Sequence, residues 1–430
     1  MRNILLAGVA LVGVSAFMTQ ANAQSAPAPT PAPTVFPTNS RAGQLDGAAP
    51  GSVTVTLGGR IFGGIEVQGG TGDTGPYATV QPNLVNYIRL YPQFDYVNPS
   101  GIHFGVSMEL RTEGAFQGFG AAHNTLFGFA GQGYVKSDKF GTFAFGTPNS
   151  ATDDLAVGTG DNYGTGGFYS EYGWVNAPIF AMADAYDGDT PHQKLAYTSP
   201  TFAGFKGAIS YQPTSVGLNN SGGLVTNLPA SGANLLASPV QSKNRIEVAA
   251  QYAHTFGSVG LKASLGWAGA GASVVGNTGG YQNVNMFTGG ASVTVAGFEI
   301  EGSVVTGKWA YNYNDAGAPF GPSLDGASNT TSFIVGVGYT LGPWAAGVQY
   351  YGVDFNVGDF ANNAAYVNEG GTVSGVALGA SYAVGPGVSV ALDVATNETK
   401  SGTYLQTTND GTKHTKTNGT MGGLGMYIQW

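Results

Sequence analysis

The feature that most constrains this chain is an alternation of apolar and polar residues with a period of two. In residues 52–68 the odd positions are apolar or glycine, while the even positions include Thr54, Arg60 and Glu66. Successive side chains of a β-strand point to opposite faces, so the pattern predicts a strand with one apolar and one polar face. The same pattern recurs as far as Trp430, so we expect an all-β chain.

The number and spacing of these segments predict the architecture. We count sixteen strands, which start near residues 52, 83, 101, 123, 140, 191, 204, 244, 259, 285, 297, 331, 343, 372, 387 and 420. Short turns alternate with long polar loops, as in transmembrane antiparallel β-barrels with short periplasmic turns and long external loops. A soluble sandwich or solenoid is less compatible, because there are too many strands for one sandwich and no fixed sequence repeat.

The composition agrees with a membrane barrel. Only 10% of the 430 residues are charged, against about 25% in soluble domains, and no stretch after the N-terminal region could form an apolar spanning helix. The net charge of −9 argues against a nucleic-acid partner. Cysteine is absent and the five histidines are scattered, so we expect no metal site, no cofactor and no disulfide scaffold.

The N-terminal region divides into two segments before the barrel. Residues 1–23 carry a basic Arg2, an apolar core and Ala-Asn-Ala, and predict a signal peptide cleaved after Ala23. A membrane anchor is the alternative, but the apolar run is short for a spanning helix. Residues 24–51 are rich in proline and alanine and predict an extended periplasmic linker, or else a tether that contacts peptidoglycan. The barrel itself is expected over residues 52–430.

Three stretches of sequence carry a family resemblance. Residues 194–213, KLAYTSPTFAGFKGAISYQP, resemble the segment after the third loop of Gram-negative general porins. Residues 134–150, YVKSDKFGTFAFGTPNS, resemble the turn before that loop, and the opening strand is also similar. In the family an arginine stands where this chain has Thr147, so part of the usual basic lining is missing here.

The resemblance implies a trimer of sixteen-stranded barrels in the bacterial outer membrane, each with its third loop folded into the lumen. It also implies contacts with the lipid bilayer, lipopolysaccharide and the barrel assembly machinery. The implied function is a water-filled channel for passive diffusion of ions and small hydrophilic solutes. The third loop, residues 148–190, would form the constriction.

Charged residues in the lumen would then filter solutes. Arg60, Arg89 and Arg111 fall on the polar faces of the first three predicted strands, where they could form a basic wall. Lys136 falls on the polar face of the fourth predicted strand but lies near a turn. The alternative is that each arginine is isolated and paired with Glu66, Glu109 or Glu113. The predicted acidic residues of the constriction loop are Asp153, Asp154, Asp161, Glu171 and Asp184, although the loop could instead be solvated and external.

Two further features concern the membrane. The final predicted strand carries Met426, Ile428 and Trp430 on one face, and it resembles the C-terminal insertion signal of outer-membrane barrels. Aromatic residues near strand ends are expected to form interfacial girdles. These are Tyr96, Phe256, Trp267, Trp309, Tyr339, Trp344 and Tyr382.

Three other functions stay open at this stage. A substrate-selective channel, for example for sugars, would show a run of aromatic residues along the lumen. An outer-membrane enzyme would need catalytic residues, but the sequence shows no local Ser/His/Asp grouping, so we expect no enzymatic activity. A structural anchor would depend on the Pro-rich segment. GSVVTGKW, residues 302–309, nearly spells a phosphate-binding loop but lies in a predicted strand.

Overall fold

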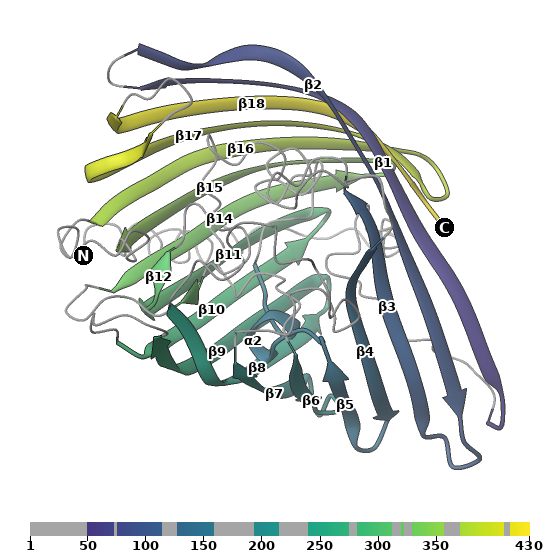
Figure 1. Cartoon of the computed structure of the whole chain (residues 1–430). Coiled ribbons are helices and arrows are strands. Elements are labelled where there is room, and N and C mark those ends of the chain that lie inside the picture. The colour runs from purple at the N-terminus through teal and green to yellow at the C-terminus, as the bar shows by residue number, and fades with distance from the viewer. Residues whose placement is uncertain are drawn as a thin grey trace. The chain divides into compact units, whose positions relative to one another are not determined.

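The computed structural model describes residues 50–72, 75–113, 127–158, 193–214, 240–274, 282–311, 320–321, 329–356, 370–407 and 413–430. Within these ranges, sixteen strands form one closed barrel in which consecutive barrel strands pair and the last strand pairs with the first (Figure 1). All the pairings are antiparallel. The predicted fold class is therefore confirmed.

The barrel strands, in chain order, have the following bounds. They are β1 (Val53–Gly72), β2 (Gly75–Val97), β3 (His103–Glu113), β4 (Phe127–Ser137), β5 (Gly141–Gly146), β6 (Lys194–Thr198), β7 (Phe205–Thr214), β8 (Val240–Phe256), β9 (Val259–Val274), β10 (Val284–Val295), β11 (Phe298–Lys308), β14 (Thr330–Leu341), β15 (Trp344–Asn356), β16 (Gly370–Gly385), β17 (Val388–Thr407) and β18 (Lys413–Gln429). A two-stranded sheet, β12 (Ala310–Tyr311) with β13 (Phe320–Gly321), and one short helix, α2 (Ala151–Asp154), lie outside this order. No helix in the described ranges is long and apolar enough to cross a membrane.

Most strands begin within a few residues of the predicted starts, with two exceptions. β2 begins at Gly75 rather than near residue 83, and β18 begins at Lys413 rather than near residue 420. The missed end of β18, KHTKTNG, is made of polar residues and glycine, so its two faces do not differ in hydropathy, whereas the missed end of β2, GPYATVQP, contains two prolines, which are unusual within a strand. The period-two signal reports only the part of a strand that has one apolar face.

Several short turns lie together at one end of the barrel. They join β2 to β3, β4 to β5, β8 to β9, β10 to β11, β14 to β15 and β16 to β17. The β2–β3 turn is closed by Asn98, whose side-chain oxygen accepts hydrogen bonds from the backbone N–H groups of Ser100 and Ile102. This is the local mechanism by which Asn favours turns. The barrel closes where β1 pairs with β18.

The two faces of the wall differ as the alternation predicts. Large apolar side chains on one face are exposed, for example Val55 at 69%, Leu84 at 80% and Leu265 at 73%. The polar positions between them are buried, among them Arg60, Glu66 and Glu109. In a closed barrel the exposed apolar face is the outer, membrane-facing one.

The inner face is less uniformly polar than the sequence suggested. Buried apolar and aromatic residues at inward positions form a cluster that includes Phe62, Met286, Ile334 and Tyr351. Trp309 belongs to this cluster and is fully buried, so its assignment to an interfacial girdle is wrong. By contrast, Trp344 and Tyr382 pack together on the outer face at the turn end, with ring centroids 4.5 Å apart.

Candidate pore lining

The three predicted arginines lie side by side on the inner wall. In the strand register Arg60 of β1 faces Arg89 of β2, and Arg89 faces Arg111 of β3. Neighbouring strands are ~4.8 Å apart, so the register forms a row of three guanidinium groups across adjacent strands. The alternation along each strand predicted that the arginine side chains face inward. The strand register shows that the three residues are aligned, which the sequence alone could not show.

Acidic and aromatic neighbours stabilise this arginine row. The Arg111 Nε donates a hydrogen bond to Glu109 Oε1 at 2.5 Å, and both side chains are buried. The Arg89 guanidinium lies 4.3 Å from the centroid of the Tyr87 ring, and that of Arg60 lies 5.3 Å from it. Ring faces attract cations, so Tyr87 offsets part of the repulsion between the adjacent charges.

Three aromatic rings lie next to the arginine row. Phe62 packs between Tyr87 and Tyr427, with ring centroids 5.6 Å and 4.7 Å away. Arg60 also lies 5.7 Å from the Tyr427 ring. The inner wall at β1, β2 and β18 therefore combines positive charge with aromatic surface, an aromatic component that the sequence analysis missed. The signal available in the sequence was that Phe62 holds an even-numbered position of β1, on the same face as Arg60.

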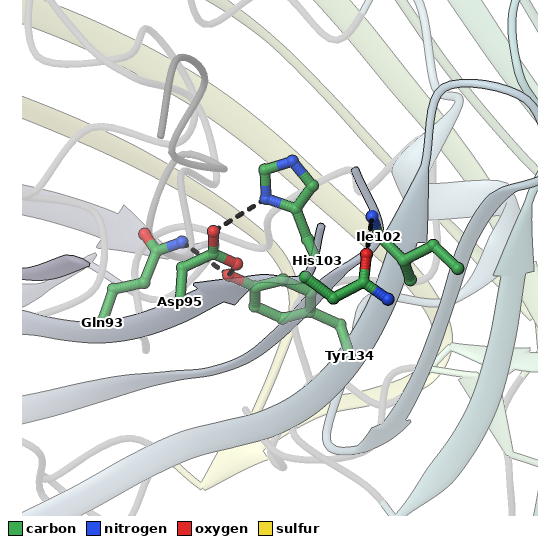
Figure 2. A network of polar contacts seen from close by, with 6 residues as sticks. Gln93, Asp95, Ile102, His103 and Tyr134 are labelled. Carbon is green, nitrogen blue, oxygen red and sulfur yellow. Dashed lines mark hydrogen bonds and ion pairs between the residues drawn. The ribbon is translucent and has the colours of Figure 1, made fainter. Parts of the chain in front are cut away.

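Lys136 does not join the row. It faces His103 in the β3–β4 register, at the turn end of β3, whereas Arg111 lies near the other end of that strand. A polar network occupies the same turn end (Figure 2). His103 Nδ1 lies 2.7 Å from Asp95 Oδ2, while the Tyr134 hydroxyl donates to Asp95 Oδ1 at 2.8 Å. Gln93 Nε2 donates to the Tyr134 hydroxyl at 3.0 Å.

The first part of the predicted constriction loop packs on the barrel wall. The helix α2 contacts β6, β7, β8 and β9. Glu247 of β8 accepts hydrogen bonds from the Thr152 hydroxyl at 2.5 Å and from the Thr152 backbone N–H at 3.2 Å. The Ala151 N–H donates to Ser210 Oγ of β7 at 3.0 Å. Inward-facing polar groups of the wall thus hold this segment inside the barrel.

A glycine in β10 allows the loop segment to approach the barrel wall closely. A Cβ built on Gly290 would lie 1.8 Å from the Val157 carbonyl oxygen, far inside van der Waals contact. Any larger residue at this inward position would collide with the loop backbone. The close approach therefore requires glycine at residue 290.

The predicted loop acids divide into two groups. Asp153 is buried within α2, whereas Asp154 is exposed and accepts a hydrogen bond from the Thr198 hydroxyl of β6 at 2.9 Å. Asp161, Glu171 and Asp184 lie outside the described residues. The role of all five in the constriction stays a prediction.

Sequence reasoning missed a second group of inward charges. Arg245 of β8 donates from Nε to Glu247 Oε1 at 2.6 Å, and both are buried. Lys194 of β6 is also buried. The alternation in Arg245-Ile246-Glu247-Val248 was the available signal. It is interrupted just before Arg245, where a register shift falls between Lys243 and Ile246 and Asn244 adopts a φ of 50°.

Thr147, the departure from the family pattern, is a structural residue. Its hydroxyl donates to the Gly131 carbonyl at 3.0 Å and accepts from the Gly131 N–H at 2.7 Å. The side chain is fully buried. It therefore fastens the end of β5 to β4 and adds no positive charge to the lumen.

The predicted insertion signal lies at the barrel seam. The Trp430 N–H and carbonyl pair with the carbonyl and N–H of Gly59, both at 3.1 Å. Met426, Ile428 and Trp430 are exposed at 46%, 38% and 56%, on the outer face. Their part in insertion is untested by this geometry. Among the residues the structure describes, no cluster of three or more His, Asp or Glu side chains could hold a metal ion.

Comparisons with known proteins agree with this architecture. A family model described as Gram-negative porin matches residues 7–402. The anion-selective porin from Comamonas acidovorans has a similar fold, with a TM-score of 0.55 at 14% identity over 88% of this chain and 100% of that one. A porin refined at 1.8 Å resolution gives a TM-score of 0.50 at 15% identity, with the same coverage. No curated protein sequence matches.

Proposed function

The chain belongs to the Gram-negative porin family, whose members form outer-membrane channels for passive diffusion, and from this premise we propose how its lumen filters solutes. The filter is the inner wall at Arg60, Arg89 and Arg111, together with the loop segment held on β6–β9. The observation that carries the proposal is the register that aligns the three arginines. Fixed charges at close quarters select permeating solutes by sign as well as by size.

The loop segment supplies the size filter in this proposal. Residues 148–158 are fastened to the inner wall by Glu247 and Ser210, so they reduce the open cross-section of the lumen. The acids that we expect further along the loop, up to residue 190, would face the lumen and oppose the arginines. Such an arrangement produces a transverse field that orients dipolar solutes.

The charge filter can be tested in a planar bilayer. Replacing Arg89→Glu exchanges a positive for a negative charge in the middle of the row, so the reversal potential under a salt gradient should move toward cation preference. We expect roughly a severalfold rise in cation over anion permeability. Lys308→Glu is the matched control, because Lys308 is exposed on the opposite face of the wall. An unchanged potential in Arg89→Glu would remove the arginine row from the filter.

A substrate-selective channel is the second candidate, and one observation favours it. Phe62, Tyr87 and Tyr427 give the inner wall an aromatic surface, and aromatic faces stack on planar or ring-shaped solutes. Single-channel recordings distinguish the two candidates. Saturable block by one class of solute would establish selectivity, whereas conductance that scales only with solute size would establish general diffusion.

Export and assembly complete the proposal. We infer that residues 1–23 are a signal peptide cleaved after Ala23 and that residues 24–51 form a periplasmic linker. We also infer that the barrel forms a homotrimer, inserts with the barrel assembly machinery and contacts lipopolysaccharide. Such a channel needs no catalytic residues, cofactor or metal. N-terminal sequencing of the mature protein tests the cleavage site, and the mass of the detergent-solubilised protein tests the trimer.

A further inference from the structure

The inner face of the barrel is apolar at the loop end of β10, β11, β14 and β15. Six inward side chains there are at most 2% exposed, namely Val284, Met286, Val305, Ile334, Tyr351 and Val353. Nearer the short turns, inward positions of β10, β11 and β14 are polar, as at Ser292, Glu301 and Thr340. The interior of a channel-forming barrel normally faces water. Apolar side chains that are buried at its mouth must therefore be covered by protein.

The small sheet of β12 and β13 is a described element that reaches this surface. In it Ala310 pairs with Gly321, and Tyr311 pairs with Phe320. β12 contacts β15, while β13 contacts β8. These two barrel strands are five places apart in the order of the wall. Because the wall curves between them, one small sheet can contact both strands only from the inside of the ring.

Trp309 anchors the start of this sheet. It immediately precedes β12 and is fully buried in the same apolar cluster as Ile334 and Tyr351. The Thr330 hydroxyl donates a hydrogen bond to the Trp309 carbonyl at 2.8 Å, and Thr330 is also fully buried. The indole buries a large apolar area, and the hydrogen bond ties the residue before β12 to the first residue of β14. Both contacts keep the sheet on the inner side of the wall.

The position of the sheet relative to the arginine row indicates what it does. In the closed ring, β9, β10 and β11 lie eight places from β1, β2 and β3, the strands that carry the arginine row. The sheet reaches from β8 to β15, so it narrows the lumen from the side opposite the arginines. Its residues Ala310, Tyr311, Phe320 and Gly321 are uncharged. Such an element restricts the size of solutes and leaves the selection by sign to the arginines.

We propose that the β12–β13 sheet forms a second constriction at the loop end of the lumen, and that Trp309 is the residue that positions it. Solutes would then pass an uncharged size filter in addition to the arginine row and the segment at α2. The inference rests on the proposed channel function but not on the ion selectivity of the arginines. The sheet and α2 belong to different connections between strands, so each can be released separately.

Conductance and solute size test the role of Trp309. Trp309→Ala removes the anchor without changing the charge, so the sheet should leave the lumen. Single-channel conductance should rise roughly twofold, because the open cross-section controls ion flow. The size limit for neutral oligosaccharides, measured by liposome swelling, should rise with it, while the reversal potential under a salt gradient stays the same. Trp309→Phe keeps an aromatic anchor and should restore the parent values. Trp344→Ala, the same exchange on the outer face, should change none of the three.

Cysteine labelling tests the position of the sheet with Trp309 intact. The chain has no cysteine, so each introduced cysteine is the single reactive site. Successive residues of a strand face opposite sides, so one of Ala310→Cys and Tyr311→Cys should face the open lumen. Labelling it with a positive or a negative methanethiosulfonate should shift the reversal potential in opposite directions. Ser258→Cys is the control, because Ser258 is exposed in the β8–β9 turn at the other end of the barrel.

Proteolysis tests the docked position without a current. Chymotrypsin cleaves after aromatic residues such as Tyr311 and Phe320, and cleavage requires local unfolding. The parent in vesicles should resist cleavage at these two sites, whereas Trp309→Ala should be cut there roughly tenfold faster. Trp309→Phe should resist as the parent does. If Trp309→Ala does not fold, cleavage of the parent and the two cysteine variants decide the matter.

Three results in a conducting parent would overturn the inference alone. They are cleavage of the parent at both sites as fast as in Trp309→Ala, an unchanged conductance and size limit in Trp309→Ala, and an unchanged reversal potential after both cysteine variants are treated. A parent that conducts no current would refute the proposed channel function and this filter together. Its resistance to chymotrypsin would still show whether the sheet is docked, so the two failures can be told apart.

Discussion

Single residues on the inner wall show how neighbouring side chains stabilise like charges that lie close together. Arg60, Arg89 and Arg111 occupy facing positions on three strands, where like charges repel. Glu109 and the Tyr87 ring supply the compensating contacts. The alternation in the sequence predicted that the arginines share one face of the sheet. It could not predict the contacts that offset their repulsion, because the position of Tyr87 relative to Arg89 depends on side-chain rotamers.

The glycine under the loop gives a prediction at this scale. Gly290→Ala would place a methyl group within 1.8 Å of the Val157 carbonyl oxygen. Because β10 is hydrogen-bonded on both sides, the loop segment should yield rather than the strand. Overpacking of this kind costs about 1–3 kcal/mol. We expect a lower free energy of unfolding in urea and an altered single-channel conductance.

Gly63→Ala is the matched control for this substitution. A Cβ at Gly63 meets nothing within 4 Å, and the residue lies on the outer face of β1. The control should leave conductance unchanged. If Gly290→Ala also leaves both stability and conductance unchanged, the loop does not lie on the wall at this point.

At the scale of elements, the sequence predicted the strands better than the loop. Alternation gave the start of β9 at Val259 and of β11 near Phe298, because large apolar residues occupy alternate positions from the first residue of each strand. The path of residues 148–158 depends on Thr152 meeting Glu247, a pair separated by 95 positions. No local pattern encodes such a contact, so the loop could be predicted only from the family resemblance.

The seam between β1 and β18 carries a prediction for the insertion signal. The Trp430 ring lies over Gly59, where a built Cβ would be 2.2 Å from its Cζ2, and its backbone closes the seam. Trp430→Ala should lower the fraction of folded barrel recovered from the outer membrane, measured by heat-modifiable mobility on gels. Trp344→Ala is the control, since Trp344 is equally exposed on the outer face, at 58%. Equal yields of the two variants would argue against a special role for Trp430.

At the scale of the whole molecule, the barrel accounts for the composition. A chain with 10% charged residues needs so little charge, because the outer face of the barrel is largely apolar. Many of its charges lie instead on the inner wall. The channel follows from this division between faces. Solute selectivity does not, because we expect it to depend on individual charged residues of the wall and of the constriction loop.

The independence of the barrel from the preceding segment is the last prediction. A variant that lacks residues 24–50 but keeps the signal peptide should show the parent's single-channel conductance, because the paired barrel strands begin at Val53. Planar-bilayer recordings check this expectation, with the intact chain as reference. A changed conductance would mean that the Pro-rich segment takes part in transport.

The closure of the ring between β1 and β18 has a kinetic consequence. Its partners, such as Ile61 and Ile428, are among the most distant pairs in the sequence, while every other pairing in the wall joins consecutive barrel strands. Contacts of long sequence separation form slowly, because the loop-closure entropy must be met first. An incomplete sheet would keep two unpaired edges, which readily recruit other chains. The pairing of β1 with β18 should therefore be the folding step at which this protein is most prone to aggregate. It is also the step that an assembly factor would most usefully accelerate.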